Sequence, residues 1–214
     1  MTRYRVAGVL GGVLLAGALL TAPVGGPVAA ADPCPDAQVV FGRGSGEPVG
    51  LGGVGQAFVA ALRGQAQDKS IADYPVNYPA THDYHSSSEA GVADTVAQVR
   101  SVIDSCPDTK IVLGGYSQGA LVMELASERL PAEAAEHVAA VTLFGPPTTA
   151  SGYATSVWGG PLPELAPAYQ PKSIDFCVPD DIVCAPAGNM VAHALGYAGS
   201  PMPQQAAEFV AGKL

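Results

Sequence analysis

Charge is scarce in this sequence, and basic charge is the scarcest. Asp, Glu, Lys and Arg make up 14% of the 214 residues, and only 10 of these are Lys or Arg against 19 Asp or Glu. The basic residues are scattered along the chain, so they do not form the continuous positive stripe that binds a phosphate backbone or an anionic membrane surface. We therefore expect no nucleic-acid partner.

Long apolar runs are also lacking, except near the start of the chain. Two arginines precede an apolar run over 6–20, which is shorter than the roughly 18 residues that a membrane span needs. The tripeptide "AAA" at 29–31 then fits an A-x-A cleavage site. We expect a secretory signal peptide over 1–31 and a protein secreted to the extracellular space. An uncleaved N-terminal anchor is the alternative.

Cleavage after Ala31 leaves 183 residues, the size of one domain, so we expect a single domain over 32–214. Its formal charge is −11, since the −9 of the whole sequence includes Arg3 and Arg5. No segment of this domain is apolar for long enough to cross a membrane, so we expect no integral membrane association. We take the domain to be a monomer.

Metal-type cysteine spacing is a further absence. The four cysteines show no paired C-x₂₋₄-C pattern, which disfavours a zinc site, and an even number in an exported chain favours two disulfides. Cys177 and Cys184 are close enough in sequence for a local bridge, which leaves Cys34 to pair with Cys106. Three connectivities are formally possible.

Apolar segments of strand length and helix length alternate along the domain. Short apolar runs predict strands at 37–41, 74–80, 110–117, 137–145 and 173–177. Helical spacing of apolar residues predicts helices at 54–62, 88–103, 118–130 and 203–213. A Pro/Gly-rich stretch over 145–171 shows no period and is expected to be a surface excursion. The alternation predicts an α/β domain with a parallel sheet covered on both faces.

The segment "GYSQG" at 115–119 matches the G-x-S-x-G pattern of hydrolase nucleophiles. Gly115 and Gly119 leave room for a sharp strand-to-helix turn that exposes Ser117, and the following helix directs its free N–H groups at the site. The predicted strand before the motif and helix after it supply the required context. A plain glycine-rich turn is the alternative.

The few histidines make the search for a catalytic base selective. In α/β-hydrolases the acid and then the histidine follow the serine along the chain. His82 and His85 precede Ser117, and no Asp separates Ser117 from His137. His193 is the last histidine and lies among small and apolar residues. The order favours His193 as the base, with a structural histidine as the alternative.

Three aspartates lie between the serine and this histidine. Asp175 falls in the last predicted strand, and Asp180 and Asp181 fall in the loop between Cys177 and Cys184. Neighbouring residues point in different directions, so at most one of the latter two orients the histidine. Spacing alone does not choose between them.

Four stretches together resemble the cutinase family of serine esterases, in particular the cutinase-like proteins of actinobacteria. They are "FGRGSGE" at 41–47, "GGYSQGA" at 114–120, "CVPDDIVC" at 177–184 and "GNMVAHALGY" at 188–197. With the two cysteine pairs they cover the expected mature chain from end to end. The resemblance is therefore to the whole domain and not to one motif.

The resemblance implies a role for each matching residue. Ser117 is the nucleophile and His193 the general base. The family's aspartate lies three residues before the second cysteine of its loop, which is Asp181 here. The oxyanion hole uses the backbone N–H of Gln118 together with the backbone N–H and hydroxyl of Ser45.

The family also implies a fold and an activity. The fold is a small α/β-hydrolase, a three-layer sandwich with a parallel sheet of about five strands and no lid domain. Cys34–Cys106 and Cys177–Cys184 are its disulfides, and no cofactor or metal is expected. The activity is hydrolysis of an ester substrate, which is an acyl lipid, a polyester or a small ester. An acyltransferase on the same scaffold and a non-catalytic secreted binding protein are the alternatives.

Some features fall outside this interpretation. A G-x-G-x-x-G match over 50–55 starts eight residues after the first strand ends, so turn glycines explain it better than a nucleotide site. His82 and His85 form an H-x-x-H without a third ligand, which favours a solvated loop over a metal site. Trp158 either lines a substrate groove or packs in the 145–171 excursion. Apolar residues near His193 suggest either a hydrophobic rim suited to acyl chains or part of the core; these are Met190, Val191, Leu195 and Tyr197.

Overall fold

The computed structural model describes residues 1–3, 8 and 34–214. The segment predicted to be a signal peptide, 1–31, lies outside the described residues apart from residues 1–3 and 8. The chain divides into two units, Met1–Pro33 and Cys34–Leu214, and the second is the folded domain. Among the described residues, no helix has the length and apolar character needed to cross a membrane.

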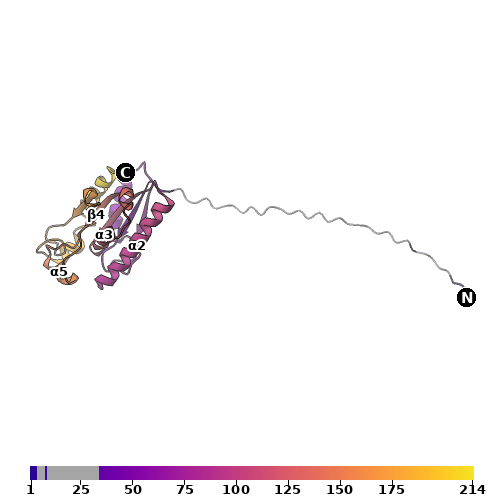
Figure 1. Ribbon diagram of the computed structural model, residues 1–214, viewed down its shortest axis with the longest axis horizontal. Helices are drawn as coiled ribbons and strands as arrows, with labels where there is room; N and C mark the ends of the chain where they lie inside the picture. The colour runs from indigo at the N-terminus through magenta and orange to yellow at the C-terminus, as the bar shows by residue number, and fades with distance from the viewer. Residues whose placement is uncertain (4–7, 9–33) are drawn as a thin grey trace. The chain divides into compact units, whose positions relative to one another are not determined.

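Five parallel strands form the central sheet in the order β2-β1-β3-β4-β5 (Figure 1). The strands are β1 (Ala37–Gly42), β2 (Ile71–Pro75), β3 (Lys110–Tyr116), β4 (Val138–Phe144) and β5 (Ser173–Phe176). Because all pairs are parallel, the carboxyl ends of the strands meet at one edge, where α/β proteins place their sites. The predicted five-stranded parallel sheet is confirmed.

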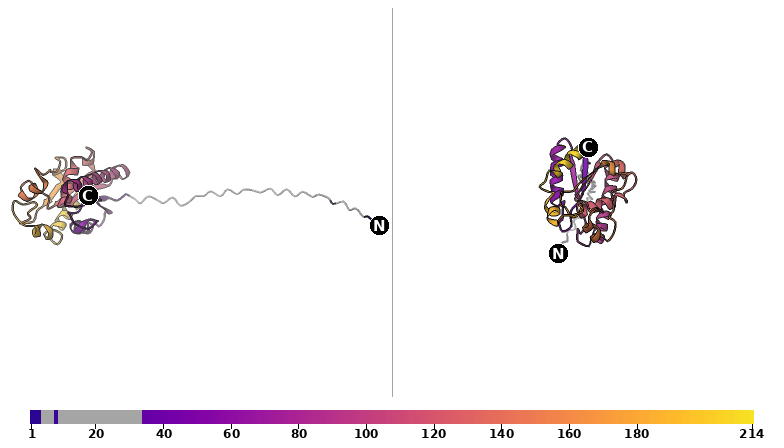
Figure 2. Two further views of the ribbon diagram at one scale, coloured as in Figure 1. Left: turned by 90° about the horizontal axis from the view of Figure 1, so that it is seen from below. Right: turned by 90° about the vertical axis from the view of Figure 1, so that its left-hand side faces the viewer.

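Helices cover both faces of the sheet, as the right-hand view of Figure 2 shows. One face is covered by α1 (Gly52–Gln65) and α7 (Met202–Ala211), which pack against each other. The other is covered by α2 (Tyr84–Ser105), α3 (Gln118–Ser127) and the short α4 (Ala134–His137). The molecule is thus a three-layer sandwich, in agreement with the prediction.

Strand alternation divides the core between the two faces. Val39 and Phe41 of β1 pack on the side of α1 and α7, whereas Val40 between them packs on the side of α2 and α3. The rings of Phe41, Phe58 and Phe144 form a cluster with centroids 6.1–6.4 Å apart. Each buried side chain of this size contributes roughly 1.5–3 kcal/mol, so this cluster fixes the sheet firmly to α1.

The second strand lies earlier than predicted, at Ile71–Pro75 and not at 74–80. Proline has no N–H to donate, and the strand ends at Pro75. β2 is an edge strand with every residue only partly buried, so it lacks the apolar run that marks the inner strands. The prolines limited the strand as expected, but its hydrophobic pattern was too weak to show where it begins.

Three short helices were not predicted, namely α4 and the following two. α5 (Gly152–Trp158) lies in the 145–171 excursion, and α6 (Met190–Leu195) carries His193. Each of these two begins at a side-chain cap: Ser151 Oγ accepts from the Ala154 N–H at 2.9 Å, and Asn189 Oδ1 accepts from the Ala192 N–H at 3.0 Å. With the 3₁₀ turn Gln170–Lys172, α5 is the regular structure of the excursion, so residues 34–214 contain no lid domain.

Both predicted disulfides are present. Cys34–Cys106 ties the segment before β1 to the residue after α2, with the two Cα atoms 5.6 Å apart. Cys177–Cys184 closes a short loop directly after β5, with a Cα separation of 5.9 Å. The first bridge braces the sheet at its N-terminal edge, and the second shapes the loop at the edge where the site lies.

Candidate active site

Ser117 occupies the turn between β3 and α3 in a strained backbone conformation. Its φ of 53° and ψ of −119° lie where a non-glycine residue costs about 1–3 kcal/mol. A Cβ on Gly119 would lie 1.9 Å from the carbonyl oxygen of Gly42, and one on Gly115 would lie 2.3 Å from that of Gly119. The two motif glycines therefore let β1, β3 and α3 approach closely enough to hold the serine in this turn.

His193 reaches the serine from α6. Its Nε2 lies 2.8 Å from Ser117 Oγ. The Tyr116 ring stacks on the imidazole with centroids 5.1 Å apart, and the Tyr116 hydroxyl donates to the His193 carbonyl at 2.8 Å. His193 is itself buried, with 4% of its surface exposed, so ring and backbone are both fixed.

Asp181 lies behind the histidine and is fully buried. Its Oδ2 is 2.7 Å from His193 Nδ1, and its Oδ1 accepts from the Val183 N–H at 2.7 Å. Since a carboxylate faces Nδ1, this nitrogen carries the proton, and Nε2 is free to accept from the serine hydroxyl. Burial by itself raises the pKa of the Asp181 carboxyl, but the hydrogen bonds that it accepts, led by that from His193, outweigh this effect and lower the pKa.

The structure brings Asp181 to the histidine, and not Asp180 or Asp175. Asp180 is exposed with a φ of 63°, and its carbonyl accepts from the Asn189 N–H at 2.8 Å. That bond joins the cysteine-closed loop to the start of α6, so the aspartate and the histidine belong to one connected unit. Asp175 lies in β5, and in the described part of the chain it makes no hydrogen bond to His193.

Tyr197 is a site residue that the sequence analysis placed either at the rim or in the core. Its side chain is 1% exposed, and its hydroxyl donates to Asp181 Oδ2 at 2.5 Å while accepting from the Val178 N–H at 3.2 Å. Burial first, and then the bond to Asp181, raise the pKa of the phenol well above its usual range. Of the two interpretations, core and not rim therefore holds for Tyr197. Met190, Val191 and Leu195 are exposed, as the rim interpretation expected.

Ser45 and Gln118 are the residues expected to form an oxyanion hole. Ser45 is in the loop after β1, Gln118 is the first residue of α3, and both line the same cleft as Ser117. Within residues 34–214, the hydrogen-bond network gives neither backbone N–H an acceptor. The Gln118 side chain donates instead to the Thr81 carbonyl at 3.1 Å, which links the nucleophile turn to the neighbouring loop.

Two charged residues shape the Ser45 loop, and the sequence analysis assigned neither of them a role. Arg43 is 3% exposed and donates to the Tyr78 carbonyl at 2.8 Å and to the Glu47 carbonyl at 3.0 Å. The Glu47 carboxylate accepts from the N–H groups of Gly44, at 2.7 Å, and Gly53, at 2.8 Å. The sequence signal for these two residues is the presence of opposite charges within an otherwise glycine-rich loop.

The cleft at Ser117 has a volume of about 220 Å³ and a largely apolar lining. Leu121 forms part of its floor, Tyr84 lines one wall, and Tyr153, Val157 and Trp158 of α5 line another. His82 also lines the cleft. Across the described ranges no three His, Cys, Asp or Glu side chains converge in a way that would hold a metal ion.

These contacts give a serine, a histidine and an aspartate in hydrogen-bonded series. This is the arrangement that lowers the barrier to attack by a hydroxyl. A protein-family model for cutinase matches residues 33–214. The chain belongs to the cutinase family. By its family it is a serine-based hydrolase of carboxylic esters.

Curated relatives match nearly the whole of this chain. The carboxylesterase Culp1 of Mycobacterium tuberculosis is 48% identical over 211 residues, which cover 98% of this chain and 95% of that protein. The phospholipase Culp4 of the same organism is 41% identical over 220 residues, covering 98% and 92%. The predicted resemblance to the cutinase family is thus confirmed.

Solved structures share the fold. A Trichoderma reesei cutinase in complex with a phosphonate inhibitor is 32% identical with a TM-score of 0.67, covering 85% of this chain and 77% of that one. An acetylxylan esterase has a TM-score of 0.72 at 25% identity, covering 85% and 99%. The predicted small α/β-hydrolase fold is therefore confirmed.

Proposed function

We propose that this protein hydrolyses aliphatic esters through an acyl-enzyme formed on Ser117. The observation that carries the proposal is the continuous series from Ser117 Oγ to His193 Nε2 and from His193 Nδ1 to Asp181, at the mouth of an apolar cleft. Each distance is within hydrogen-bonding range in the absence of substrate, so the hydroxyl is already in contact with its base.

In the first half-reaction His193 takes the Ser117 proton as the oxygen attacks the ester carbonyl. The tetrahedral oxyanion accepts hydrogen bonds from the N–H of Gln118 and from the N–H and hydroxyl of Ser45. The C–O bond to the alcohol then breaks, and His193 returns its proton to the leaving oxygen. Water attacks the acyl-enzyme by the same route, which releases the acid and restores the serine.

Asp181 remains a carboxylate throughout this cycle. Its lowered pKa keeps it ionised while the imidazole beside it gains a positive charge. Because the pair is buried, the attraction between aspartate and imidazolium is stronger than it would be in water. Each oxyanion donor is worth roughly 3 kcal/mol of barrier in enzymes of this type.

The substrate class follows from the cleft and its surroundings. The cleft wall is apolar, and exposed apolar side chains continue from it onto the surface on both sides, namely Tyr153, Val157, Met190, Val191 and Leu195. Such a surface suits an acyl chain or an insoluble ester and not a charged metabolite. Relatives named carboxylesterase and phospholipase agree with a lipid-type ester.

We further propose that the enzyme acts outside the cell as residues 32–214, after removal of the signal peptide at 1–31. Two disulfides support this, because such bridges persist in oxidising compartments.

Hydrolysis of p-nitrophenyl esters with two to sixteen acyl carbons tests the proposed activity. We expect release of p-nitrophenol that Ser117→Ala reduces by at least about 1000-fold, in line with loss of the nucleophile. Ser105→Ala, an exposed serine at the end of α2, is the matched control and retains activity. Equal rates for wild type and Ser117→Ala would contradict the proposal. Transfer of the acyl group to an added alcohol faster than to water would indicate an acyltransferase instead.

A further inference from the structure

One histidine and the single tryptophan form a contact that catalysis does not use. The rings of His85 and Trp158 stack with centroids 3.9 Å apart and an interplanar angle of 24°. His85 Nε2 also donates to the Trp158 carbonyl at 2.9 Å. His85 lies in the first turn of α2, and Trp158 is the last residue of α5. We call this pair the clasp.

The hydrogen bond satisfies an atom that the end of a helix leaves unpaired. The last carbonyls of a helix accept no hydrogen bond from an N–H of the same helix. Gly159, the residue after α5, has a φ of 85° and donates its N–H back to the Thr155 carbonyl. Of the carbonyls that follow Thr155 in this helix, that of Trp158 accepts a hydrogen bond from the imidazole of His85.

The other attachments of α5 lie on a different side. Its first turn is held by Ser151, whose hydroxyl donates to the Ile182 carbonyl at 2.5 Å. Its inner surface rests on a small apolar cluster that includes Leu121 and Leu162. Among the hydrogen bonds within residues 34–214, the His85 bond is the one that joins α5 to α2. The clasp therefore holds the far end of α5.

The clasp joins two walls of the acyl-binding cleft. Tyr84, the residue before His85, lines the cleft from α2. Val157, the residue before Trp158, lines it from α5, as does Tyr153 one turn earlier. The contact between these walls therefore lies at the edge of the cleft, since Trp158 is part of the lining and His85 is not.

We propose that the clasp sets the width of this cleft and thereby limits the length of the acyl chain that the enzyme accepts. This inference rests on the esterase function proposed above. With the clasp intact, α5 stays against α2 and favours short acyl chains. Without it, the end of α5 moves outward and the cleft accepts longer ones. His85 and Trp158 are in this view specificity-determining residues and take no part in the chemistry.

The test combines a structural readout with a kinetic one in His85→Ala. Trp158 is the sole tryptophan, so its fluorescence reports on the clasp alone. We expect a red-shifted emission and a larger acrylamide quenching constant. In parallel, the ratio of kcat/KM for p-nitrophenyl laurate to that for p-nitrophenyl butyrate should rise about 3- to 10-fold, mainly through KM, a size typical of small changes in an apolar pocket.

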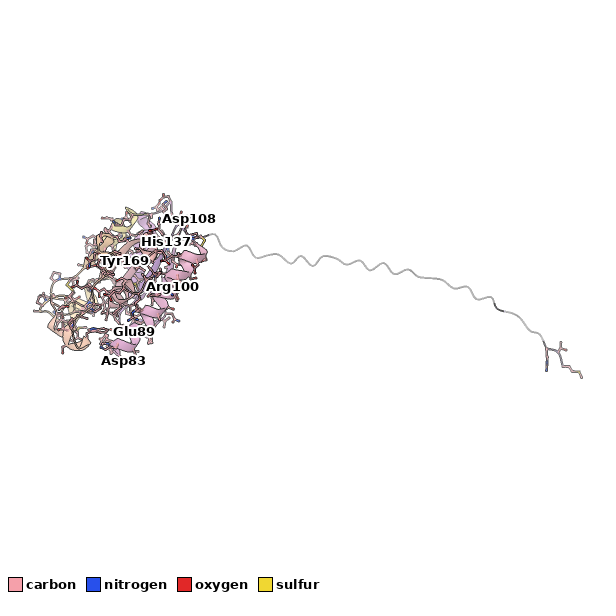
Figure 3. The ribbon with its side chains drawn as sticks, in the orientation of Figure 1. Asp83, Glu89, Arg100, Asp108, His137 and Tyr169 are labelled. Carbon is pink, nitrogen blue, oxygen red and sulfur yellow. A yellow bond between two sulfur atoms is a disulfide. The ribbon has the colours of Figure 1, made fainter. Side chains whose placement is uncertain are left out.

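One control variant and two conservative variants of His85 complete the test. His137→Ala removes a histidine from α4, far from the cleft; Figure 3 shows His137 near the top of the domain and Asp83, two residues before His85, at the bottom. It should leave emission and selectivity unchanged. His85→Phe retains a stacking ring without the donor, and His85→Gln retains a donor without the ring. Partial effects in both would assign the clasp to stacking and hydrogen bonding together.

The outcomes separate the inference from the function on which it rests. Greater exposure of Trp158 together with a shift towards longer esters supports the inference. Unchanged fluorescence, or greater exposure with an unchanged chain-length profile, overturns it while leaving the esterase intact. A wild-type protein without Ser117-dependent hydrolysis would overturn the proposed function, and the specificity role with it.

Discussion

At the residue scale, the site depends on the buried carboxylate of Asp181, which accepts hydrogen bonds from three groups. Asp181 accepts from His193, from the Val183 N–H and from the Tyr197 hydroxyl. The tyrosine disperses the negative charge and fixes the carboxylate plane relative to the imidazole. It is a positioning residue, since within the described structure it does not line the cleft and makes no hydrogen bond to Ser117.

Replacement of Tyr197 by Phe tests this role. We expect kcat to fall about 10-fold, consistent with loss of a hydrogen bond to a charged group. The acid limb of the kcat/KM profile should move to higher pH, because a less dispersed charge on Asp181 favours the protonated imidazole. Tyr169→Phe, another buried tyrosine far from the site, is the matched control. An unmoved acid limb would reduce Tyr197 to a packing role.

A second buried carboxyl affects stability and not catalysis. Glu124 on α3 is 7% exposed, and its Oε2 lacks a hydrogen-bond partner within the described part of the chain. Burial, and then the negative charges of Asp175 and Glu164, raise its pKa well above 4.5. The folded protein therefore holds this proton at pH values where the unfolded chain has lost it.

The sign of the pH effect follows from this shift. The contribution of Glu124 is complete below about pH 4.5 and declines as pH rises towards its folded pKa. We expect Glu124→Gln to raise the melting temperature at pH 8 by several degrees, roughly 2–4 °C per kcal/mol, and to flatten its decline between pH 5 and 8. Glu128→Gln, exposed one turn later, serves as control. Parallel melting curves for Glu124→Gln and wild type at all pH values would refute the assignment.

At the element scale, the two disulfides have different tasks. Cys34–Cys106 spans 72 residues and braces strand and helix ends, whereas Cys177–Cys184 spans 7 and encloses Asp181. If a bridge acts by restricting the unfolded chain, the long one is worth roughly 4 kcal/mol and the short one roughly 2 kcal/mol.

Serine replacements of each pair should separate these tasks. Removal of Cys34 and Cys106 should lower the melting temperature more and leave kcat near that of wild type at a temperature where the variant is folded. Removal of Cys177 and Cys184 should lower the melting temperature less but reduce kcat about 10-fold or more, because the loop that holds Asp181 loosens. Calorimetry gives the melting temperature and ester hydrolysis gives kcat, both on the same samples. The reverse ranking in kcat would contradict the assignment.

At this scale, some features of the site were predictable from the sequence and others were not. The "GYSQG" turn was predictable because its glycines, strand and helix are contiguous in sequence. α6 was not predicted, since its six residues are too few to show a helical period. Asp181 and Asp180 were not separable by spacing, because a left-handed residue at Asp180 decides which side chain faces the histidine. The clasp joins residues 73 apart, which no local pattern reveals.

At the scale of the whole molecule, the acidic charge and the two bridges agree with an enzyme that works outside the cell. Removal of residues 1–31 changes the formal charge from −9 to −11 and leaves the domain intact from Cys34. A high net charge of one sign favours solubility in a protein that also exposes apolar side chains around its cleft.

The N-terminus of the exported protein tests this account. We expect intact mass and N-terminal sequencing of the protein from culture medium to give Asp32 as the first residue. Replacement of Ala29 and Ala31 by bulky residues should retain the full-length form, because the cleavage site needs small side chains. An exported protein that still begins at Met1 would contradict the proposed processing.

The central claim is that Ser117 is an activated nucleophile, and covalent trapping tests it most directly. The protein is incubated with diethyl p-nitrophenyl phosphate, and peptide mass spectrometry locates the diethylphosphoryl group. We predict one stoichiometric adduct on Ser117, formed with loss of esterase activity, and no adduct in Ser117→Ala. An unmodified Ser117, or modification of another residue while ester hydrolysis is lost, would contradict the account.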